Sequence, residues 1–238
     1  MASGIDTLQR PARRPTMRMN IPSETRQGVV VIQLRTAVGD AAGERRRQIV
    51  TAAAACFARS GFHGATMPEI CAEASLSPGT VYRYFRSKEE LIEAIVEDDR
   101  AESLSFLDAL AGEPDVAVAI AAALDTAFAD LAEPGAAALY VEVCAEAARN
   151  PRVAAVVRRH DASVSAALTA LLRGAQERGE IDPSLDLGAT VWLLNALFDG
   201  VIVHKALVPD LDLAALAPSL RPVIDGLLGA NRTGPGAG

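Results

Sequence analysis

Aromatic residues, histidines and cysteines are scarce in this 238-residue sequence. Aromatics make up 4% of the chain, and there are three His and three Cys. Cys56, Cys71 and Cys144 are odd in number and widely spaced, which argues against a disulfide framework and suits a reducing cytoplasm. No Cys-x-x-Cys pair, Cys/His cluster, His-Glu-x-x-His motif or glycine-rich phosphate loop occurs. We therefore expect no metal, no cofactor and no enzyme, although an all-α enzyme is the main alternative class.

Long apolar runs are missing as well. No uninterrupted stretch approaches the ~20 apolar residues that cross a bilayer. The Arg-rich first segment is not followed by an apolar stretch with a small-residue cleavage site, as a secretory signal would be. We expect a cytoplasmic protein that does not contact a membrane. Half of the residues are hydrophobic, enough for a sizeable core in one or two domains.

Positive charge is outnumbered over the whole chain but concentrated at its front. The net charge of −7 combines six Arg against three acids in residues 1–43, seven Lys and Arg against three acids in residues 44–88, and ten against 24 in residues 89–238. Because a polyanion needs only local cations, a basic front on an acidic body is compatible with DNA binding. By itself, a basic segment is more often a solvated tail or face.

Proline and glycine interrupt residues 1–43, which show no sustained helical or alternating pattern. We interpret this segment as a disordered basic arm, and Met17 or Met19 remains an alternative start. From Glu44 onward, apolar residues recur at three- and four-residue steps between Gly and Pro breaks. This pattern predicts an all-α body.

Capping residues divide the basic front into short helices. A first helix is predicted over residues 44–60, with Gly61 at its end. The arginines of residues 45–47 at its start would form a solvated face in most proteins, and here they are alternatively a source of sequence-independent attraction to DNA. Thr66 and Glu69 form a capping box for a helix over residues 67–74. Two short helices joined by a tight turn describe a helix-turn-helix, so the next helix is the candidate recognition helix.

Ser77 caps this candidate recognition helix, which starts with Pro78 and runs to Phe85. Val81 and Phe85 are expected to face the core with Ile70 and Leu76. The opposite side then offers a glycine for close backbone approach, hydroxyls and one guanidinium, which is the chemistry that DNA contacts require. The residues expected there are Gly79, Thr80, Tyr82 and Arg83, with Thr66 and Lys88 flanking the unit.

This stretch resembles the N-terminal domain of TetR-type transcriptional regulators over about 50 residues. The resemblance lies in Gly61-Phe62, in Thr66, in Gly79-Thr80-Val81-Tyr82-Arg83-Tyr84-Phe85 and in Lys88-Glu89-Glu90-Leu91. Two positions depart from the pattern: Cys71 stands where a small Ala is usual, and Ser75-Leu76 replaces Gly-Val. Without that glycine, Ser75 is expected to adopt a left-handed conformation at some cost.

The resemblance implies a three-helix helix-turn-helix DNA-binding domain followed by a helical ligand-binding and dimerisation domain. It implies a homodimer on palindromic double-stranded DNA and repression relieved by a small-molecule effector, whose identity it does not give. The expected divisions are residues 1–43 (arm), 44–90 (DNA-binding domain), 91–230 (ligand-binding and dimerisation domain) and 231–238 (flexible tail). By position, the implied DNA contacts are Thr66, Ser77, Pro78 (through its backbone), Gly79, Thr80, Tyr82, Arg83 and Lys88.

Two apolar segments near the C-terminus predict the dimer interface. Residues 185–207 are apolar on nearly all sides, and residues 212–229 carry a second stripe that includes Val223, Ile224 and Leu227. The alternative is a large monomeric core. Because Pro218 and Pro222 lie inside the last segment, we expect a break or sharp bend between Ala215 and Arg221.

A ligand pocket is expected among the helices of residues 90–180 and the start of the helix that carries Trp192. The candidate lining residues are Phe106, Phe128, Tyr140, Cys144, His160, Trp192 and Asn195. Each of these side chains is alternatively a plain core residue. His63, which lies in a turn near the front of the chain, is expected to be solvated. The third possible class is a helical binding protein that does not bind DNA. The helix-turn-helix pattern at the front of the chain argues against this class.

Overall fold

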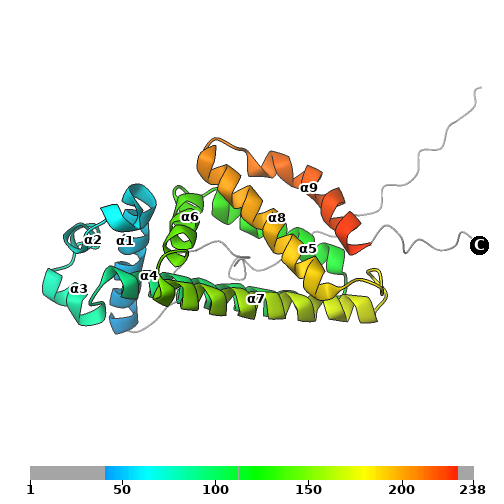
Figure 1. The fold of residues 1–238 in the computed structure, drawn as a ribbon, viewed down its shortest axis with the longest axis horizontal. Coiled ribbons are helices and arrows are strands. Elements are labelled where there is room, and N and C mark those ends of the chain that lie inside the picture. The colour runs from blue at the N-terminus through cyan, green and yellow to red at the C-terminus, as the bar shows by residue number, and fades with distance from the viewer. Residues whose placement is uncertain (1–40, 112, 230–238) are drawn as a thin grey trace, which may run out of the picture.

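The structure is a computed structural model, and it describes residues 41–111 and 113–229. Every regular element in these residues is an α-helix, so the all-α expectation is confirmed there (Figure 1). The helices are α1 (Ala41–Gly64), α2 (Met67–Glu73), α3 (Pro78–Tyr84), α4 (Lys88–Ala111), α5 (Val116–Leu131), α6 (Ala136–Ala147), α7 (Pro151–Glu177), α8 (Leu187–Leu207) and α9 (Leu213–Leu228). The predicted arm and tail lie outside the described residues, except that α1 already begins at Ala41.

The helices form a small unit and a larger body (Figure 1). α1, α2 and α3 lie together at one end, and α5 to α9 make up the body, with the long helix α7 along one side of it. α4 packs along α7 over much of its length. The expected boundary between residues 90 and 91 falls inside α4. A single helix therefore belongs to both units and connects them mechanically.

Local capping explains the short helices of the small unit. α1 is interrupted at Gly61, whose φ of 73° departs from helical geometry at the predicted end. Thr66 and Glu69 form the predicted capping box of α2, and the Ser77 side chain accepts from the Thr80 N–H to cap α3. The turn between α2 and α3 holds Ser75 at a φ of 53°, the left-handed conformation that its sequence position predicts.

The core of the small unit unites its three helices with the start of α4. Val81 from α3 is fully buried, and Phe85, which follows α3, is 6% exposed, as their spacing predicts. They pack in one cluster with Ile70 of α2 and Leu91 of α4. This cluster fixes the rotation of α3 about its axis, so the face opposite Val81 points away from the core.

The predicted break in the last helix is wrong, because α9 is continuous from Leu213 to Leu228 through both Pro218 and Pro222. Each proline removes one backbone donor, which leaves the carbonyls of Ala214 and Pro218 without a helical partner. Ala214, Pro218 and Pro222 are four residues apart and all exposed. The unpaired carbonyls therefore face the solvent side of the helix, where water can satisfy them.

Both ends of α9 are also anchored. Asp212 caps the start by accepting from the Ala215 N–H at 3.1 Å, and Gly229 ends the helix in a left-handed conformation. Ile224 and Leu228 are buried in a cluster of this chain's own core. The expectation that Ile224 faces a partner subunit is therefore corrected, while its neighbour Val223 is 50% exposed.

α8 is apolar all round, as expected, and starts two residues later than predicted. Val191, Val201 and Ile202 are buried in two clusters of the body, whereas Trp192 and Leu207 are 69% and 72% exposed. By length and mean hydropathy, 1.4 over 18 residues, α8 is the one helix in the described residues that would also suit a membrane span. Its buried residues show that it is a structural part of the helical body.

Candidate nucleic-acid interface and effector cavity

α3 presents a compact polar face to the outside. Gly79, Tyr82 and Arg83 are exposed, and 47% of the Tyr82 surface is accessible. A Cβ atom built on Gly79 would meet no other atom within 4 Å. The backbone of α3 is therefore open at Gly79, which allows a large, flat partner to approach closely.

Hydrogen bonds within α3 hold its first turn rigid. The Ser77 hydroxyl lies 2.9 Å from the Thr80 hydroxyl and accepts from the Thr80 N–H at 3.2 Å. At the other end, the Arg83 guanidinium lies 5.5 Å from the centre of the Tyr84 ring. The sequence-predicted side chains of this helix are therefore placed along one short, well-capped face.

Thr66 and Lys88, which were expected to flank this face, both have partners inside the protein. The Thr66 hydroxyl and N–H donate to the Glu69 carboxylate at 2.9 and 2.8 Å, and these bonds lower the pKa of Glu69. The Lys88 ammonium donates to the carbonyls of Phe62 at 2.5 Å and Ala65 at 2.8 Å, with a weaker contact to His63 at 3.4 Å. A phosphate contact by Lys88 would require its ammonium to leave these carbonyls.

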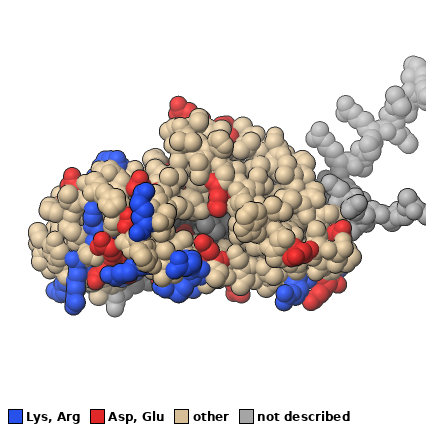
Figure 2. Space-filling model, in the orientation of Figure 1, with Lys and Arg blue, Asp and Glu red and all other residues tan. Residues whose placement is uncertain are grey.

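The arginines of residues 45–47 do not form one solvated face. Arg46 pairs with Asp98 of α4 at 2.7 Å and so joins the small unit to the connecting helix. Arg45 is exposed and bonds to Gln48, whereas Arg47 is partly buried. In the space-filling view, most Lys and Arg side chains lie over the end that contains α1 to α4, and the face over α8 and α9 is nearly free of them (Figure 2).

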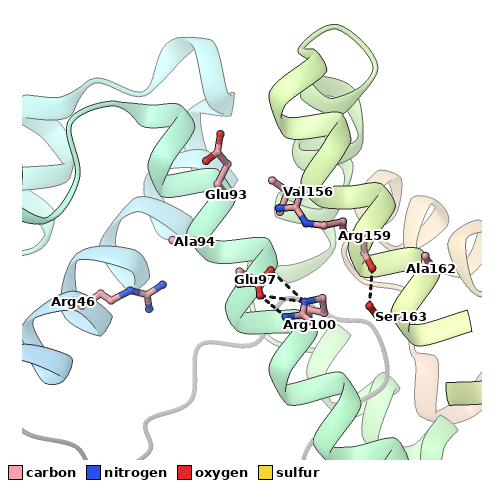
Figure 3. A pocket seen from close by; sticks show the side chains of 9 residues that line it. All are labelled: Arg46, Glu93, Ala94, Glu97, Arg100, Val156, Arg159, Ala162 and Ser163. Carbon is pink, nitrogen blue, oxygen red and sulfur yellow. Dashed lines mark hydrogen bonds and ion pairs between the residues drawn. The ribbon is translucent and has the colours of Figure 1, made fainter. Parts of the chain in front are cut away.

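A charged groove of about 660 Å³ lies where α1, α4 and α7 meet (Figure 3). Its acidic groups are already paired: Glu97 binds Arg100 on the same helix, and Glu93 binds Arg152 of α7 at 2.9 Å. The hydrogen bond from Arg100 lowers the pKa of Glu97, so the two groups stay ionised and paired with each other. Neither charge is therefore free to bind a ligand. The groove is therefore a polar seam between the two units.

A second cavity, of about 370 Å³, lies inside the larger body among α5 to α9. Four of the seven predicted pocket residues line it: Tyr140, His160, Trp192 and Asn195. The other three lie elsewhere. Phe106 and Phe128 are buried in separate core clusters, and Cys144 is beside Tyr140, where burial raises the pKa of its thiol.

The polar groups of this cavity form two cross-helix hydrogen bonds. The Tyr140 hydroxyl of α6 donates to Asp199 of α8 at 2.6 Å, and the Asn195 amide of α8 donates to the Ser165 hydroxyl of α7 at 3.2 Å. Burial raises the pKa of Asp199, and the nearby charge of Asp161 raises it further. Sequence reasoning missed both carboxylates, although a lone aspartate in the otherwise apolar α8 was the available signal for Asp199.

His160 connects the cavity wall to α4. Its Nε2 lies 2.8 Å from Asp99 Oδ2, and both side chains are almost fully buried; its Nδ1 lies 3.2 Å from Asp161 Oδ1. The Nε2 contact is an ion pair that lacks hydrogen-bond alignment. Burial lowers the pKa of His160, but the hydrogen bond to Asp161 and the negative charges of Asp99 and Asp161 outweigh burial and raise it to about 9.

α6 forms a second connection, from the cavity to the end of α1. Tyr140 of α6 lines the cavity, while Glu142 accepts from the Phe62 N–H at 3.0 Å. One turn further on, the buried Glu146 carboxylate lies 3.2 Å from His63 Nε2. His63 is exposed, as predicted, but it also has this partner on α6. Two helices of the cavity therefore contact the small unit or its connecting helix.

The comparisons with known proteins divide the chain in the same way. Residues 49–95 match the family described as bacterial regulatory proteins, tetR family. Residues 116–229 match the family described as BetI-type transcriptional repressor, C-terminal. The first match covers α2, α3 and most of α1, and the second covers α5 to α9.

Individual relatives agree with these matches. The transcriptional regulator UidR of Escherichia coli (strain K12) is 34% identical over 187 residues, which are 78% of this chain and 94% of UidR. The structure of Salmonella enterica GusR has a TM-score of 0.64 and 31% identity, and the likeness covers 81% of this chain and 99% of GusR. FadR from Bacillus subtilis, solved in complex with stearoyl-CoA, shares the fold, with a TM-score of 0.68 at 20% identity over 77% of this chain and 97% of FadR.

The fold and the two sites define a helix-turn-helix regulator with a helical effector domain. The chain belongs to the TetR family of transcriptional regulators. It is a ligand-responsive, DNA-binding transcriptional regulator, and its relative UidR is named as a transcriptional regulator.

Proposed function

We propose that this protein represses transcription as a homodimer on a palindromic operator and leaves the DNA when an effector fills the cavity of about 370 Å³. The observation that carries the proposal is that one continuous helix, α4, joins the recognition unit to the wall of that cavity. Repression of this kind takes place on DNA in the cytoplasm. Each subunit would place α3 in the major groove of one half-site.

The exposed face of α3 supports a division of labour at the DNA. Gly79 allows the backbone to approach a phosphate, and Tyr82 offers a hydroxyl to the same strand. Thr80 and Arg83 are placed to read base edges, where a guanidinium can bind guanine in a bidentate manner. Ser77 lies at a helix start, where backbone N–H groups suit phosphate binding. Pro78 has no N–H to donate and can add only van der Waals contact. Thr66 would first have to release its two hydrogen bonds to Glu69.

Lys88 enters this proposal as a positioning residue. Its ammonium can use all three protons on the carbonyls of residues 62, 63 and 65. It therefore fixes the end of α1 against the start of α4. Its contribution to DNA binding would come from holding the unit in shape.

An exposed apolar face on α8 and α9 supports the homodimer. It consists of Trp192, Leu193, Val203, Leu207, Val208 and Val223, each more than 40% exposed. Ala196 and Gly200 lie between these side chains on α8, and a Cβ atom on Gly200 would meet nothing within 4 Å. A second copy of the same two helices can cover this face by two-fold symmetry, as a four-helix interface.

The cavity can communicate with the DNA through two contacts. His160 of α7 pairs with Asp99 of α4, and Glu146 of α6 pairs with His63 at the end of α1. An effector that displaces α6 or α7 changes these contacts and so changes the spacing of the two recognition helices. Such a switch requires that the contacts differ between the effector-bound and the effector-free protein.

The experiment is a mobility shift and footprint on the DNA upstream of the protein's own gene and its neighbours. We expect a protected palindrome with half-sites about one helical turn or somewhat more apart. Leu207→Glu should convert the dimer to monomers in sedimentation and weaken DNA binding by at least about 30-fold, the effect of a loss of ~2 kcal/mol at an interface. Val118→Glu, on the exposed side of α5, is the matched control.

Three outcomes would contradict the proposal. One is a single protected half-site, which would exclude a symmetric dimer on the DNA. Another is a Leu207→Glu protein that stays dimeric, which would place the interface elsewhere. The third is a specific complex that forms only when an effector is added, which would indicate activation.

A further inference from the structure

The Arg46 side chain of α1 contacts both the residue that ends α3 and a carboxylate of α4. Its Nη1 donates to the two oxygens of Asp98 at 2.7 and 3.0 Å. The same guanidinium lies over the ring of Phe85, 5.8 Å from the ring centre, which is within the range of a cation–π contact. Phe85 directly follows α3, and its N–H donates to the Val81 carbonyl at 3.0 Å. One side chain therefore joins the end of α3 to α4.

These contacts give the small unit a second attachment to α4. The first is Lys88, which fixes the start of α4 against the end of α1. Asp98 lies about 15 Å further along α4, given the rise per residue of an α-helix. Because the two attachments are separated along the helix axis, they fix the angle between α4 and the small unit. A single attachment would leave this angle free to change.

The residue after Asp98 connects the same turn of α4 to the cavity. Asp99 lies 2.8 Å from His160 of α7, and His160 lines the cavity. Consecutive residues of a helix point ~100° apart, so the two neighbouring carboxylates engage different helices, α1 and α7. A displacement of α7 that moves this turn of α4 therefore acts on Arg46 as well.

We propose that Arg46 is a positioning residue for operator binding. Through Asp98 and Phe85 it holds α3 in the orientation that fits the major groove, and it passes a displacement of α4 on to α3. The inference rests on the proposed function, because it takes α3 as the recognition helix. Figure 3 shows the Arg46 side chain on α1 directed toward α4, where it lines the groove between the two units and is paired with Asp98. In this role Arg46 acts through α3 and not through a phosphate of its own.

Asp98→Asn separates positioning from a phosphate contact by the sign of its effect. The change removes a negative charge, which by charge alone should strengthen binding to a polyanion. If Asp98 instead holds Arg46 in place over Phe85, the variant should bind the operator at least about fivefold more weakly than the parent protein. The measurement is a mobility shift of the full-length protein. Equal or tighter binding by Asp98→Asn would overturn the proposal.

Arg46→Met removes the charge but keeps an apolar stem, and should weaken operator binding at least about tenfold. Arg45→Met is the matched control, because it removes the same charge from the neighbouring, exposed side chain. It should weaken binding less than about threefold, and the salt slopes of the two variants should agree. Equal losses of affinity, or a slope for Arg46→Met that is lower than the control by about one, would indicate a phosphate contact and overturn the proposal.

Combined variants test whether the contacts act as one unit. Arg46→Met/Asp98→Asn should bind the operator about as tightly as Arg46→Met alone, because either single change already breaks the same contact. The effect of His160→Gln on operator affinity should fall by at least about half when Arg46 is replaced, since its connection to α3 is then lost. Additive losses in the first pair, or an undiminished effect of His160→Gln in the second, would overturn the proposal.

Arg46→Lys serves as the conservative variant. Lysine keeps a charge for Asp98 but has no planar guanidinium to lie over Phe85, so operator affinity should fall between those of the parent protein and Arg46→Met. Thermal unfolding of every variant is recorded alongside, because a positioning residue should change operator affinity in proteins that remain folded. Affinity of Arg46→Lys no higher than that of Arg46→Met would show that the pair with Asp98 contributes nothing, and would overturn the proposal.

The parent protein and Gly79→Ala separate this inference from the proposed function. If the parent protein protects an operator and Gly79→Ala weakens binding, while the Arg46 and Asp98 variants bind as the parent does, the positioning role is wrong and the regulator function stands. If the parent protein protects no operator, the proposed function fails, and the positioning role fails with it.

Discussion

The small unit and the cavity among α5 to α9 hold their polar side chains in different ways. In α2 and α3, the capping bonds of Thr66 and Ser77 join residues that are three positions apart. In the cavity, Tyr140 and Asp199 are 59 positions apart, and Ser165 and Asn195 are 30 apart. The recognition helix is therefore shaped by short-range interactions, whereas the cavity exists only when five helices pack together.

This difference suits a switch. In the proposed function, a rigid, locally capped recognition helix would keep its DNA-facing surface unchanged while its position moves. A cavity assembled from separate helices can change shape when a ligand occupies it, because each polar contact depends on the relative placement of two helices. The His160–Asp99 pair lies at the border between these two regions, since it joins the cavity wall to α4.

The largest effect we expect is a pH dependence of stability caused by His160. Its pKa of about 9 exceeds the model-peptide value of 6.5, so the folded protein binds the proton more tightly than the unfolded chain. This stabilisation is fully present below pH ~6.5 and is lost as the pH rises through about 9, a change of ~3 kcal/mol in the free energy of unfolding. Urea unfolding of the parent protein and His160→Gln over this range measures it. Parallel curves for the two proteins would contradict the assignment.

Lys88→Met should have the next largest effect, on the recognition unit itself. The change leaves the carbonyls of Phe62 and Ala65 without their charged donor, which should cost ~2 kcal/mol of unfolding free energy. Arg86→Met, which also removes one positive charge but from an exposed side chain, is the matched control. If Lys88→Met instead leaves stability unchanged and lowers the salt slope of DNA binding by about one, the residue binds a phosphate as its sequence position suggests.

The same contrast explains what could be predicted from the sequence. The caps of α2 and α3, the left-handed Ser75 and the burial of Val81 follow from neighbours within a few residues, and all are present. The continuity of α9 was missed because the cost of Pro218 depends on which side of the helix faces water, and this is a property of the packed structure. The pairing of distant polar groups was missed for the same reason.

The residues of the cavity show why contacts between distant positions could not be predicted from the sequence. Tyr140, His160, Trp192 and Asn195 were candidates because polar or aromatic side chains in apolar helices are unusual, and they do line one cavity. Phe106 was a candidate on the same grounds but is a core residue. Residue type suggests which side chains can line a cavity, and only the crossing of the helices decides which ones do.

Gly79→Ala should weaken DNA binding by at least about tenfold, an effect of ~1.4 kcal/mol or more. In the free protein the added methyl group meets no atom within 4 Å, and alanine in a helix is favoured over glycine by ~1 kcal/mol. The variant should therefore unfold at an equal or higher temperature while it binds the operator less tightly, because the methyl group occupies the space of the approaching DNA backbone. Undiminished affinity in a mobility shift would show that α3 does not approach DNA closely at this residue.

The smallest effect, and the most local one, concerns the turn between the two helices of the motif. Ser75 has a φ of 53°, a conformation that costs an L-residue other than glycine ~1–2 kcal/mol. Ser75→Gly removes this strain but gives the unfolded chain more conformational freedom, which lowers the free energy of unfolding by ~0.5–1 kcal/mol. The expected net gain in unfolding free energy is thus ~0.5–1 kcal/mol. Ser75→Ala retains the Cβ and the strain, so it should show no such gain. Chemical unfolding of the three proteins measures the difference, and a Ser75→Gly protein that is less stable than its parent would mean that the Ser75 side chain contributes more to this turn than its backbone costs.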